Sequence, residues 1–411
     1  MPTLENLVFN FIPIDPEVAG GITTVCQMMA THLPPELPDA RTLVLTAGHA
    51  WDNRIPLTGR TECLDLPSSS NHGAGPRLLA KLCPGHTPGL GSRIWARLHR
   101  RDPAFPFDLA LKTVVHCPYQ ILHPKPGRHW NLPYVINLHD LQHEHFPEFF
   151  TPKDLERRKT RYLASAMAAQ AVCVVDEWTR RDVLSHLPIP ESKVHVAPFG
   201  PTWEVAAALT PEDRRQLLER YDLPPAFAFY PAQTWPHKNH ARLVEALGAL
   251  HQRGVQIPLV CTGHINDHGT RIKAQVEALG LGSQVRFLGL IPARDIKQLY
   301  QAARMTVIPT LFEGGPGIPV LESMALGSPL AASTACGIPE AVGETAVLFD
   351  PLDIGDMARA LELLWTDEAL RVGLSEGARR RSALNTWKRA AATYRDVYAE
   401  ALRRWKVEHG R

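Results

Sequence analysis

Residues 305–333 read MTVIPTLFEGGPGIPVLESMALGSPLAAS, and this stretch indicates the fold class. The runs MTVIPT and SPLAAS at its two ends are apolar without alternation, which is typical of strands buried on both faces. Between them, Pro319 suits the first turn of a helix and Gly327 suits its C-terminal cap. A strand, a helix and a second strand in succession predict a parallel sheet covered by helices.

The same alternation of short apolar runs and helical patterns fills most of the chain. The expected strands of a first domain are NLVFNFIP, RTLVLTA, LKTVVHC, PYVINLHD, AVCVV and KVHVAP, and those of a second are AFAFYPA, IPLVCTG, QVRFLG, MTVIPT, SPLAAS and TAVLFDP. Stretches such as ARLVEALGALHQRG and ARDIKQLYQAA predict helices between them. The sequence therefore predicts an α/β protein with two doubly wound parallel sheets and a boundary near residue 200.

Composition limits the classes of function. The chain has 411 residues, 45% hydrophobic and 21% charged, which suits two globular domains, and its formal charge of +2 gives no sign of a nucleic-acid partner. Its 7 cysteines are scattered and form no C-x-x-C pair, so we expect reduced thiols rather than disulfides or a zinc site. The start MPTLENLVFNF does not resemble a signal peptide, and no apolar run approaches the roughly 18 residues of a membrane-spanning helix. We therefore expect a cytoplasmic protein.

The loop EGGPGI at 313–318 carries the first chemical signal. It offers exposed backbone N–H groups at the start of a helix, where an anionic phosphate is favoured. Glu313 and Glu322 bracket this helix start, and carboxylates there suit the vicinal hydroxyls of a sugar or ribose. Phosphate and hydroxyl groups together describe a nucleotide-sugar. The alternative is that the two glutamates only cap and decorate the helix.

Two further stretches predict contacts to phosphate. In YPAQTWPHKNHARLVEAL, Lys238 and Asn239 follow a strand and open a helix, and the lysine would add a cation for a departing phosphate. The alternative is an exposed lysine at a helix start. In FIPIDPEVAGGITTVCQMMATHL, Gly20 and Gly21 join a strand to a helix, which permits close backbone approach to a phosphoryl group. A plain turn is the alternative.

Histidines end two of the predicted strands. His139 and Asp140 end the strand in VINLHDLQHEHFPEFF, and the metal-binding residue types at 143–145 follow. The arrangement is not H-E-x-x-H, so no metal site is predicted. His116 in VVHCPYQ is either a residue that lines a cleft or a hydrogen-bonded core histidine.

Taken together, these stretches resemble the GT4-type retaining glycosyltransferases, also called glycosyltransferase group 1. The likeness rests on YPAQTWPHKNH, HDLQHEHFPEFF, FEGGPGIPVLESMALGSPL and GIPEAVGETAVLFDP, and it covers almost the whole chain. The resemblance implies the GT-B fold, in which two Rossmann-like doubly wound domains face each other across a cleft. It also implies that no metal and no cofactor are needed.

The resemblance assigns a role to each matching position. Glu322 matches the glutamate on the ribose hydroxyls, and Glu313 matches the one on the transferred hexose. Lys238 matches the lysine on the diphosphate, and Gly21 matches the glycine that approaches it from the N-terminal domain. His139 matches a histidine beside the donor sugar.

The remaining matches complete the predicted site. Asp140 follows His139 on the acceptor side, and the loop residues face phosphate and sugar through their backbone N–H groups. The predicted catalytic residues are Glu313, Lys238, His139 and Asp140, and the predicted donor-binding residues are Gly20, Gly21, Gln233, Asn239, Gly315, Gly317, Ile318 and Glu322.

The chain departs from the family pattern at three points. Eight residues separate Glu313 from Glu322 where seven are usual, so one residue must be looped out. Gln233 stands where an arginine is usual, which removes one phosphate cation. Asp176 stands where serine is common.

The resemblance implies an N-terminal acceptor-side domain at 1–200, completed by a C-terminal helix at about 390–411. Residues 201–389 would form the domain that binds the nucleotide-sugar. The expected reaction moves a hexose from a nucleotide-sugar to a glycan or lipid-linked glycan acceptor with retention of configuration. The motifs favour mannose and GDP-mannose. The alternatives are a nucleotide-sugar epimerase of the same architecture and a non-catalytic glycan-binding or scaffold protein.

The segment 77–101 is basic and carries interleaved apolar residues and a tryptophan. Such a helix can lie on anionic lipid, which would suit a lipid-linked acceptor and a peripheral location at the membrane. The alternative, which we favour, is a solvated helix face packed on the sheet.

Overall fold

The structure is a computed structural model that describes residues 4–12, 14, 21–47, 51, 55, 61–66, 112–123, 125–126, 131–203 and 208–410. Gly20 and the basic segment 77–101 lie outside the described residues, so the predictions made for them stay predictions.

The N-terminal sheet has seven strands in the order β3-β2-β1-β4-β5-β6-β7. The strands are β1 (Asn6–Asn10), β2 (Arg41–Ala47), β3 (Thr61–Leu66), β4 (Thr113–Cys117), β5 (Tyr134–Asn137), β6 (Ala171–Val174) and β7 (Val194–Val196). The central strand β1 pairs in parallel with both β2 and β4, and Val8 lies opposite Leu43 on one side and Val115 on the other. Every residue of β1 and β4 is buried, as the apolar runs predict.

The C-terminal sheet has six strands in the order β10-β9-β8-β11-β12-β13. The strands are β8 (Ala228–Pro231), β9 (Leu259–Thr262), β10 (Val285–Phe287), β11 (Met305–Ile308), β12 (Leu330–Ser333) and β13 (Val347–Phe349). Neighbouring strands pair in parallel throughout this sheet. The two parallel sheets confirm the predicted doubly wound, Rossmann-like architecture.

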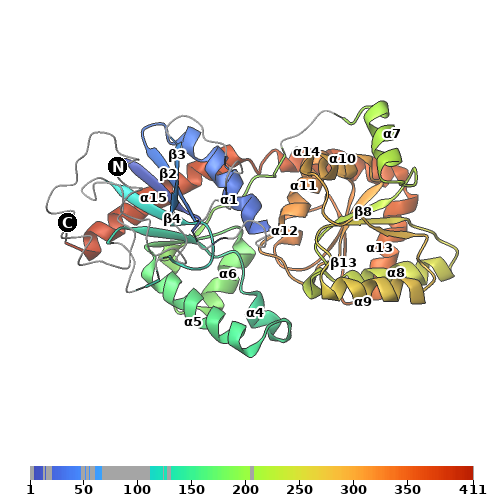
Figure 1. Cartoon of the computed structure of the whole chain (residues 1–411), viewed down its shortest axis with the longest axis horizontal. Coiled ribbons are helices and arrows are strands. Elements are labelled where there is room, and N and C mark those ends of the chain that lie inside the picture. The colour runs from blue at the N-terminus through green and yellow to red at the C-terminus, as the bar shows by residue number, and fades with distance from the viewer. Residues whose placement is uncertain are drawn as a thin grey trace. The chain divides into compact units, whose positions relative to one another are not determined.

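Helices connect the strands. The described α-helices are α1 (Gly21–His32), α4 (Gln142–His145), α5 (Pro152–Ala168), α6 (Glu177–His186), α7 (Pro211–Arg220), α8 (His240–Gln252), α9 (Asp267–Ala278), α10 (Ala293–Ala302), α11 (Ile318–Leu326), α12 (Ile338–Val342), α13 (Ile354–Thr366), α14 (Glu368–Ser382) and α15 (Trp387–Glu408). In Figure 1, α8, α9 and α13 cover one face of the C-terminal sheet, and α10, α11 and α14 cover the other.

Each run predicted as a strand forms one, but the sequence prediction missed β3. Its sequence, TECLDL, mixes polar and apolar residues without a continuous apolar run, and Glu62 and Cys63 are exposed. The strand lies at the edge of its sheet, where burial on both faces is not required. A search for continuous apolar runs therefore passes over it.

The chain divides into two compact units. The N-terminal unit comprises Met1–Leu138, Arg161–Cys173 and Ala391–Arg411. The C-terminal unit comprises His139–Thr160 and Val174–Ala390. The segments that carry α4 and α6 thus belong with the C-terminal sheet's unit, and the last part of α15 belongs with the N-terminal unit.

Candidate active site

The loop at 313–317 joins β11 to α11 at the carboxyl end of the parallel strand. Pro319 is in the first turn of α11, and Gly327 ends the helix in the left-handed conformation with φ of 68°, as predicted. Gly315 and Gly317 also have positive φ, at 70° and 79°. The loop therefore leads directly into a helix N-terminus, where backbone N–H groups favour an anion.

Glycine is required at both loop positions. A Cβ at Gly315 would meet Val175 Cγ1 at 2.1 Å, and one at Gly317 would meet Glu313 Oε2 at 3.0 Å. Four residues separate Glu313 from Ile318, where α11 begins, and the looping out of one residue between the two glutamates stays a prediction.

Lys238 and Glu313 form an ion pair in this structure. Lys238 ends a short 3₁₀ turn (Pro236–Lys238) after β8, and its Nζ lies 2.5 Å from Glu313 Oε1. The two side chains are only 17% and 10% exposed. The strands β8 and β11 are neighbours, so their carboxyl ends bring these residues together. The cation predicted for the diphosphate thus contacts the carboxylate predicted for the hexose.

The histidines that flank Lys238 do not add to its charge. Burial lowers the pKa of His237 to about 2 and that of His240 to about 3. Both imidazoles are therefore neutral at pH 7. Of the three basic side chains in PHKNH, only the lysine carries charge there.

Asn239 holds the turn that presents Lys238. It is buried, adopts the left-handed conformation with φ of 60°, and donates both amide hydrogens, to Pro309 O at 2.9 Å and Pro351 O at 2.8 Å. Asparagine tolerates this backbone conformation better than most residues. Asn239 therefore ties three loops together at the carboxyl edge of the sheet.

Gln233 lies between β8 and the lysine turn. Its Oε1 accepts a hydrogen bond of 2.7 Å from the indole of Trp235, whose side chain is exposed. The bond uses the carbonyl of the amide and orients the side chain. Gln233 offers no positive charge where the family usually has arginine.

Glu322 lies on α11 with a buried side chain. Tyr300 on α10 donates a hydrogen bond of 2.8 Å to Glu322 Oε2. Burial raises the pKa of Glu322 to about 7. The carboxyl is therefore balanced between its neutral and charged forms near neutral pH, and a hydroxyl donated to it would favour the charged form.

His139 and Asp140 lie beside the glycine loop. A Cβ at Gly314 would meet the His139 carbonyl oxygen at 3.0 Å, so the two backbones pack directly. The His139 ring lies 5.7 Å from that of Phe199. Asp140 Oδ1 accepts from the backbone N–H of Gln142, the first residue of α4, at 3.1 Å.

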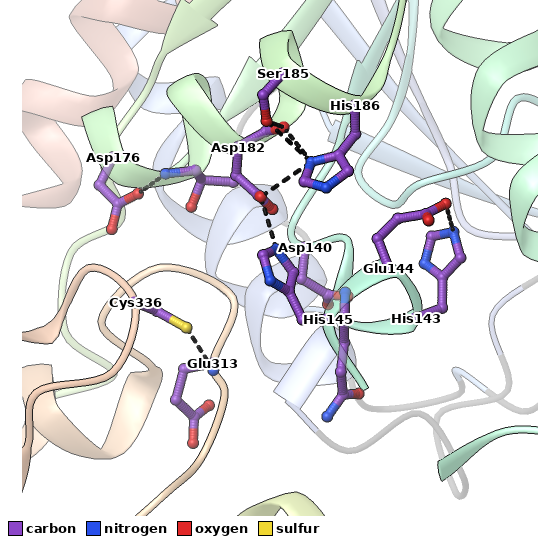
Figure 2. Close-up of polar contacts among 12 residues, drawn as sticks. Asp140, His143, Glu144, His145, Asp176, Asp182, Ser185, His186, Glu313 and Cys336 are labelled. Atoms are coloured by element: carbon purple, nitrogen blue, oxygen red, sulfur yellow. Dashed lines mark hydrogen bonds and ion pairs between the residues drawn. The ribbon is translucent and has the colours of Figure 1, made fainter. Parts of the chain in front are cut away.

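Asp176, the residue at the family's usual serine position, also reaches this loop. Its Oδ1 accepts from the backbone N–H of Thr179 and caps α6, as Figure 2 shows. Its Oδ2 lies 3.1 Å from a Cβ at Gly315 and 1.7 Å from one at Gly337. Burial raises the pKa of Asp176, and Oδ2 has no hydrogen-bond partner among the described residues. The absence of side chains at both glycines makes room for this carboxyl.

The predicted site residues fall into two groups. The first group, His139, Asp140, Gln233, Lys238, Asn239, Glu313, Gly315, Gly317, Ile318 and Glu322, belongs to the C-terminal unit. Gly21 belongs to the N-terminal unit, where it is the first residue of α1.

His116 proves to be a core residue rather than one that lines a cleft. It is fully buried and bonds Tyr398 Oη at 2.8 Å and Asn137 Oδ1 at 2.6 Å.

Sequence reasoning missed Tyr300 and the neutral state of the flanking histidines. Tyr300 lies in ARDIKQLYQAA, an ordinary helical pattern in which nothing marks one tyrosine as the partner of a distant glutamate. The histidine pKa values depend on burial, which the motif does not reveal. The sequence shows Asp176 at a position where the family commonly has serine, but it does not predict the contact of Asp176 with the glycine loop.

Comparison with known proteins finds a family model that matches part of the chain. Residues 212–381 match the model for "Glycosyl transferases group 1". This part of the chain is a group 1 glycosyltransferase domain, which confirms the resemblance.

Two curated relatives from Escherichia coli are mannosyltransferases by name. The chain is 26% identical to O-antigen chain mannosyltransferase B over 82% of this chain and 84% of that protein. It is 27% identical to the serotype-specific mannosyltransferase WbdA over 72% of this chain. The chain spans only 34% of the length of WbdA.

Solved structures establish the fold. Sucrose-phosphate synthase from Thermosynechococcus elongatus has a TM-score of 0.71 at 18% identity, covering 96% of this chain and 98% of that one. HepE from Anabaena, in complex with UDP and glucose, has a TM-score of 0.67 at 17% identity, covering 96% and 99%. The fold is GT-B, as predicted.

Among the helices that the structure describes, none is both long and apolar enough to cross a membrane.

Proposed function

We propose that this protein is a GT4-type retaining hexosyltransferase that needs no metal for transfer. It moves a hexose, with mannose favoured, from a nucleotide-sugar to a glycan or lipid-linked glycan during polysaccharide assembly. The observation that carries the proposal is the Lys238–Glu313 pair beside the glycine loop that opens α11. The group 1 match and the names of the mannosyltransferase relatives support it.

In the proposed donor site, each charged residue contacts a different part of the nucleotide-sugar. The diphosphate lies against the N–H groups at the start of α11 and against the Lys238 ammonium, which has three donors and can contact phosphate and Glu313 together. Glu313 accepts from hydroxyls of the hexose, and Glu322 accepts from the ribose. The UDP and glucose bound by HepE support a nucleotide-sugar as the ligand class.

In the proposed transfer step, the bond between the anomeric carbon and the phosphate oxygen breaks. The acceptor oxygen bonds to that carbon on the same face, and its proton passes to the departing phosphate oxygen. Charge grows on the diphosphate as it leaves, and Lys238 and the helix start stabilise it. The protein thus contributes position and charge rather than a nucleophile.

We expect Lys238 to change its partners when the donor binds. Before the donor binds, the cation is neutralised by a carboxylate at 2.5 Å, so it does not hold a bare charge in a partly buried site. The diphosphate then shares the lysine with Glu313. GDP-mannose is the favoured donor, and a cytoplasmic location stays a prediction.

The test measures donor use directly. GDP-mannose, UDP-glucose and ADP-glucose are each supplied with a panel of mannan and lipid-linked acceptors, and the glycosidic product is analysed by NMR for its anomeric configuration. The expected result is transfer from GDP-mannose with an α-linked product. Conversion of the donor without any acceptor would indicate the epimerase, and neither binding nor turnover would indicate a scaffold.

A further inference from the structure

A cluster of possible metal ligands lies outside the residues assigned to the donor. His145 is the last residue of α4, and Asp182 and His186 lie on α6. Asp182 and His186 are four residues apart, which places them one above the other on the same face of the helix. Figure 2 shows the carboxylate of Asp182 between the two imidazole rings.

The donor atoms of the three side chains are within reach of one ion. One ligand atom from each residue lies within 4.8 Å of the other two. His145 Nε2 is 2.7 Å and His186 Nδ1 is 3.2 Å from Asp182 Oδ1. Tetrahedral ligands about 2.0–2.1 Å from a zinc ion are separated by roughly 3.3 Å, so small side-chain shifts complete the geometry.

Burial and charge at Asp182 supply an independent reason for a cation. Its side chain is only 5% exposed, and its Oδ2 has no hydrogen-bond partner among the described residues. Within that part of the chain, its ion pairs are with His145 and His186 and with no lysine or arginine. Buried carboxylates are normally paired with a cation or bound to a metal, and neutral imidazole is the form that binds metal.

The two histidines leave one side of the cluster open. Their side chains are 32% and 33% exposed, so water or another ligand can occupy a fourth position. Two imidazoles and one carboxylate suit zinc, and imidazole ligands disfavour magnesium and calcium, which prefer oxygen.

We propose that His145, Asp182 and His186 bind one zinc ion or a similar divalent transition metal. The ion joins the end of α4 to α6. The His145 ring also lies 5.1 Å from that of Phe312, and Trp178 on α6 lies 5.8 Å from the same ring. Phe312 directly precedes Glu313, so the ion fixes the rings against which the start of the 313–317 loop packs. It is a structural metal and takes no part in the proposed transfer.

The competing arrangement is a hydrogen-bonded network without an ion. His186 Nδ1 lies 2.9 Å from the Asp182 carbonyl oxygen and 3.0 Å from Ser185 Oγ. A proton on that nitrogen satisfies these oxygens, and zinc binding there requires the tautomer with the proton on Nε2.

The experiment uses the tag-free full chain, stripped with a chelator and desalted. Zinc is titrated in competition with a chromophoric chelator, and cobalt binding is followed by its visible absorption. The expected result is one equivalent of zinc with a Kd of about 1 μM or tighter, a cobalt spectrum typical of nitrogen and oxygen ligands, and a rise in melting temperature with zinc concentration.

Two variants assign the ligands. Asp182→Asn keeps the size of the side chain, His186→Ala removes one imidazole, and each should weaken zinc binding about 100-fold or more. The matched control, His264→Ala, removes an exposed histidine elsewhere in the same unit and should leave the Kd unchanged. Circular dichroism identifies any variant that fails to fold.

Three results would overturn the proposal: no zinc uptake at about 100 μM, equal affinity in folded Asp182→Asn, or loss of binding in His264→Ala. The first would leave the hydrogen-bonded network as the explanation. The titration contains no nucleotide-sugar, so its outcome is separate from that of the proposed function.

Discussion

The N-terminal unit and the C-terminal unit each bury a polar cluster, and the two clusters differ in charge. In the first, His116, Asn137, Tyr394 and Tyr398 form a chain of neutral hydrogen bonds of 2.6–2.8 Å in which each residue is at most 1% exposed. The second contains the Lys238–Glu313 ion pair and, in the same unit, Glu322, whose pKa is raised by burial to about 7, and Asp176, whose Oδ2 has no hydrogen-bond partner among the described residues.

The contrast separates a network that stabilises the fold from charges that suit a charged ligand. A neutral network in which each polar group has a hydrogen-bond partner offsets the free-energy cost of burying those groups. This network connects the last part of α15 to the N-terminal sheet. Charges and unpartnered oxygens near a helix start cost stability in the absence of a ligand. They are expected where a charged ligand completes them.

The largest effect is expected from Lys238→Ala. Removing the cation leaves the departing diphosphate with the helix start alone, so turnover should fall by about 10²–10³, as for loss of one contact to transition-state charge. The measurement is kcat under saturating donor. A value within threefold of wild type would refute the role.

The matched control for that experiment is Glu313→Gln, which keeps the shape of the Lys238 partner and removes its charge. Lys238 then no longer has a competing carboxylate, so affinity for the nucleoside diphosphate should rise by roughly tenfold even as transfer falls. Calorimetry with GDP measures this. Parallel losses of affinity in both variants would contradict the proposed sharing of the lysine.

The second prediction concerns Glu322 and pH. Its pKa of about 7 in the folded protein exceeds the ordinary 4.5, so the folded protein holds the proton more tightly. The resulting stability is complete below pH 4.5 and is lost as pH rises through 7, by about 3 kcal/mol in total. Glu322→Gln removes this loss, so its stability relative to wild type should rise between pH 5 and pH 8.

Denaturant titration of the C-terminal unit's unfolding at pH 5, 6, 7 and 8 measures this difference. The exposed Glu277→Gln serves as the control and should show no such trend. An equal pH dependence in wild type and Glu322→Gln would mean that the carboxyl is not held neutral by burial.

The smallest effect is expected in the N-terminal unit. Tyr398→Phe removes the buried hydroxyl that bonds His116, which should cost about 1–2 kcal/mol of unfolding free energy. The control is Tyr119→Phe, whose buried hydroxyl contacts the weakly hydrogen-bonding thiol of Cys117 rather than an imidazole, so its removal should cost less. A loss of stability in the control as large as in Tyr398→Phe would assign the effect to packing instead.

Much of the fold was predictable because its signals are local. Buried parallel strands show as uninterrupted apolar runs, and α11 is marked by Pro319 at its start and Gly327 at its end. Strand β3 was missed because an edge strand need not be apolar on both faces. The candidate site was predicted residue by residue through the family resemblance, while its contacts were not.

Local sequence signals predict the parallel-sheet architecture, the glycine loop and the position of Lys238 at a strand's carboxyl end, since periodicity, caps and backbone freedom depend on neighbouring residues. Folding brings Lys238 to Glu313, 75 residues away, and Tyr300 to Glu322. It also determines that His237 and His240 are neutral and that His145 meets Asp182. These properties follow from burial and from contacts between distant segments, and neither exists until the chain has folded.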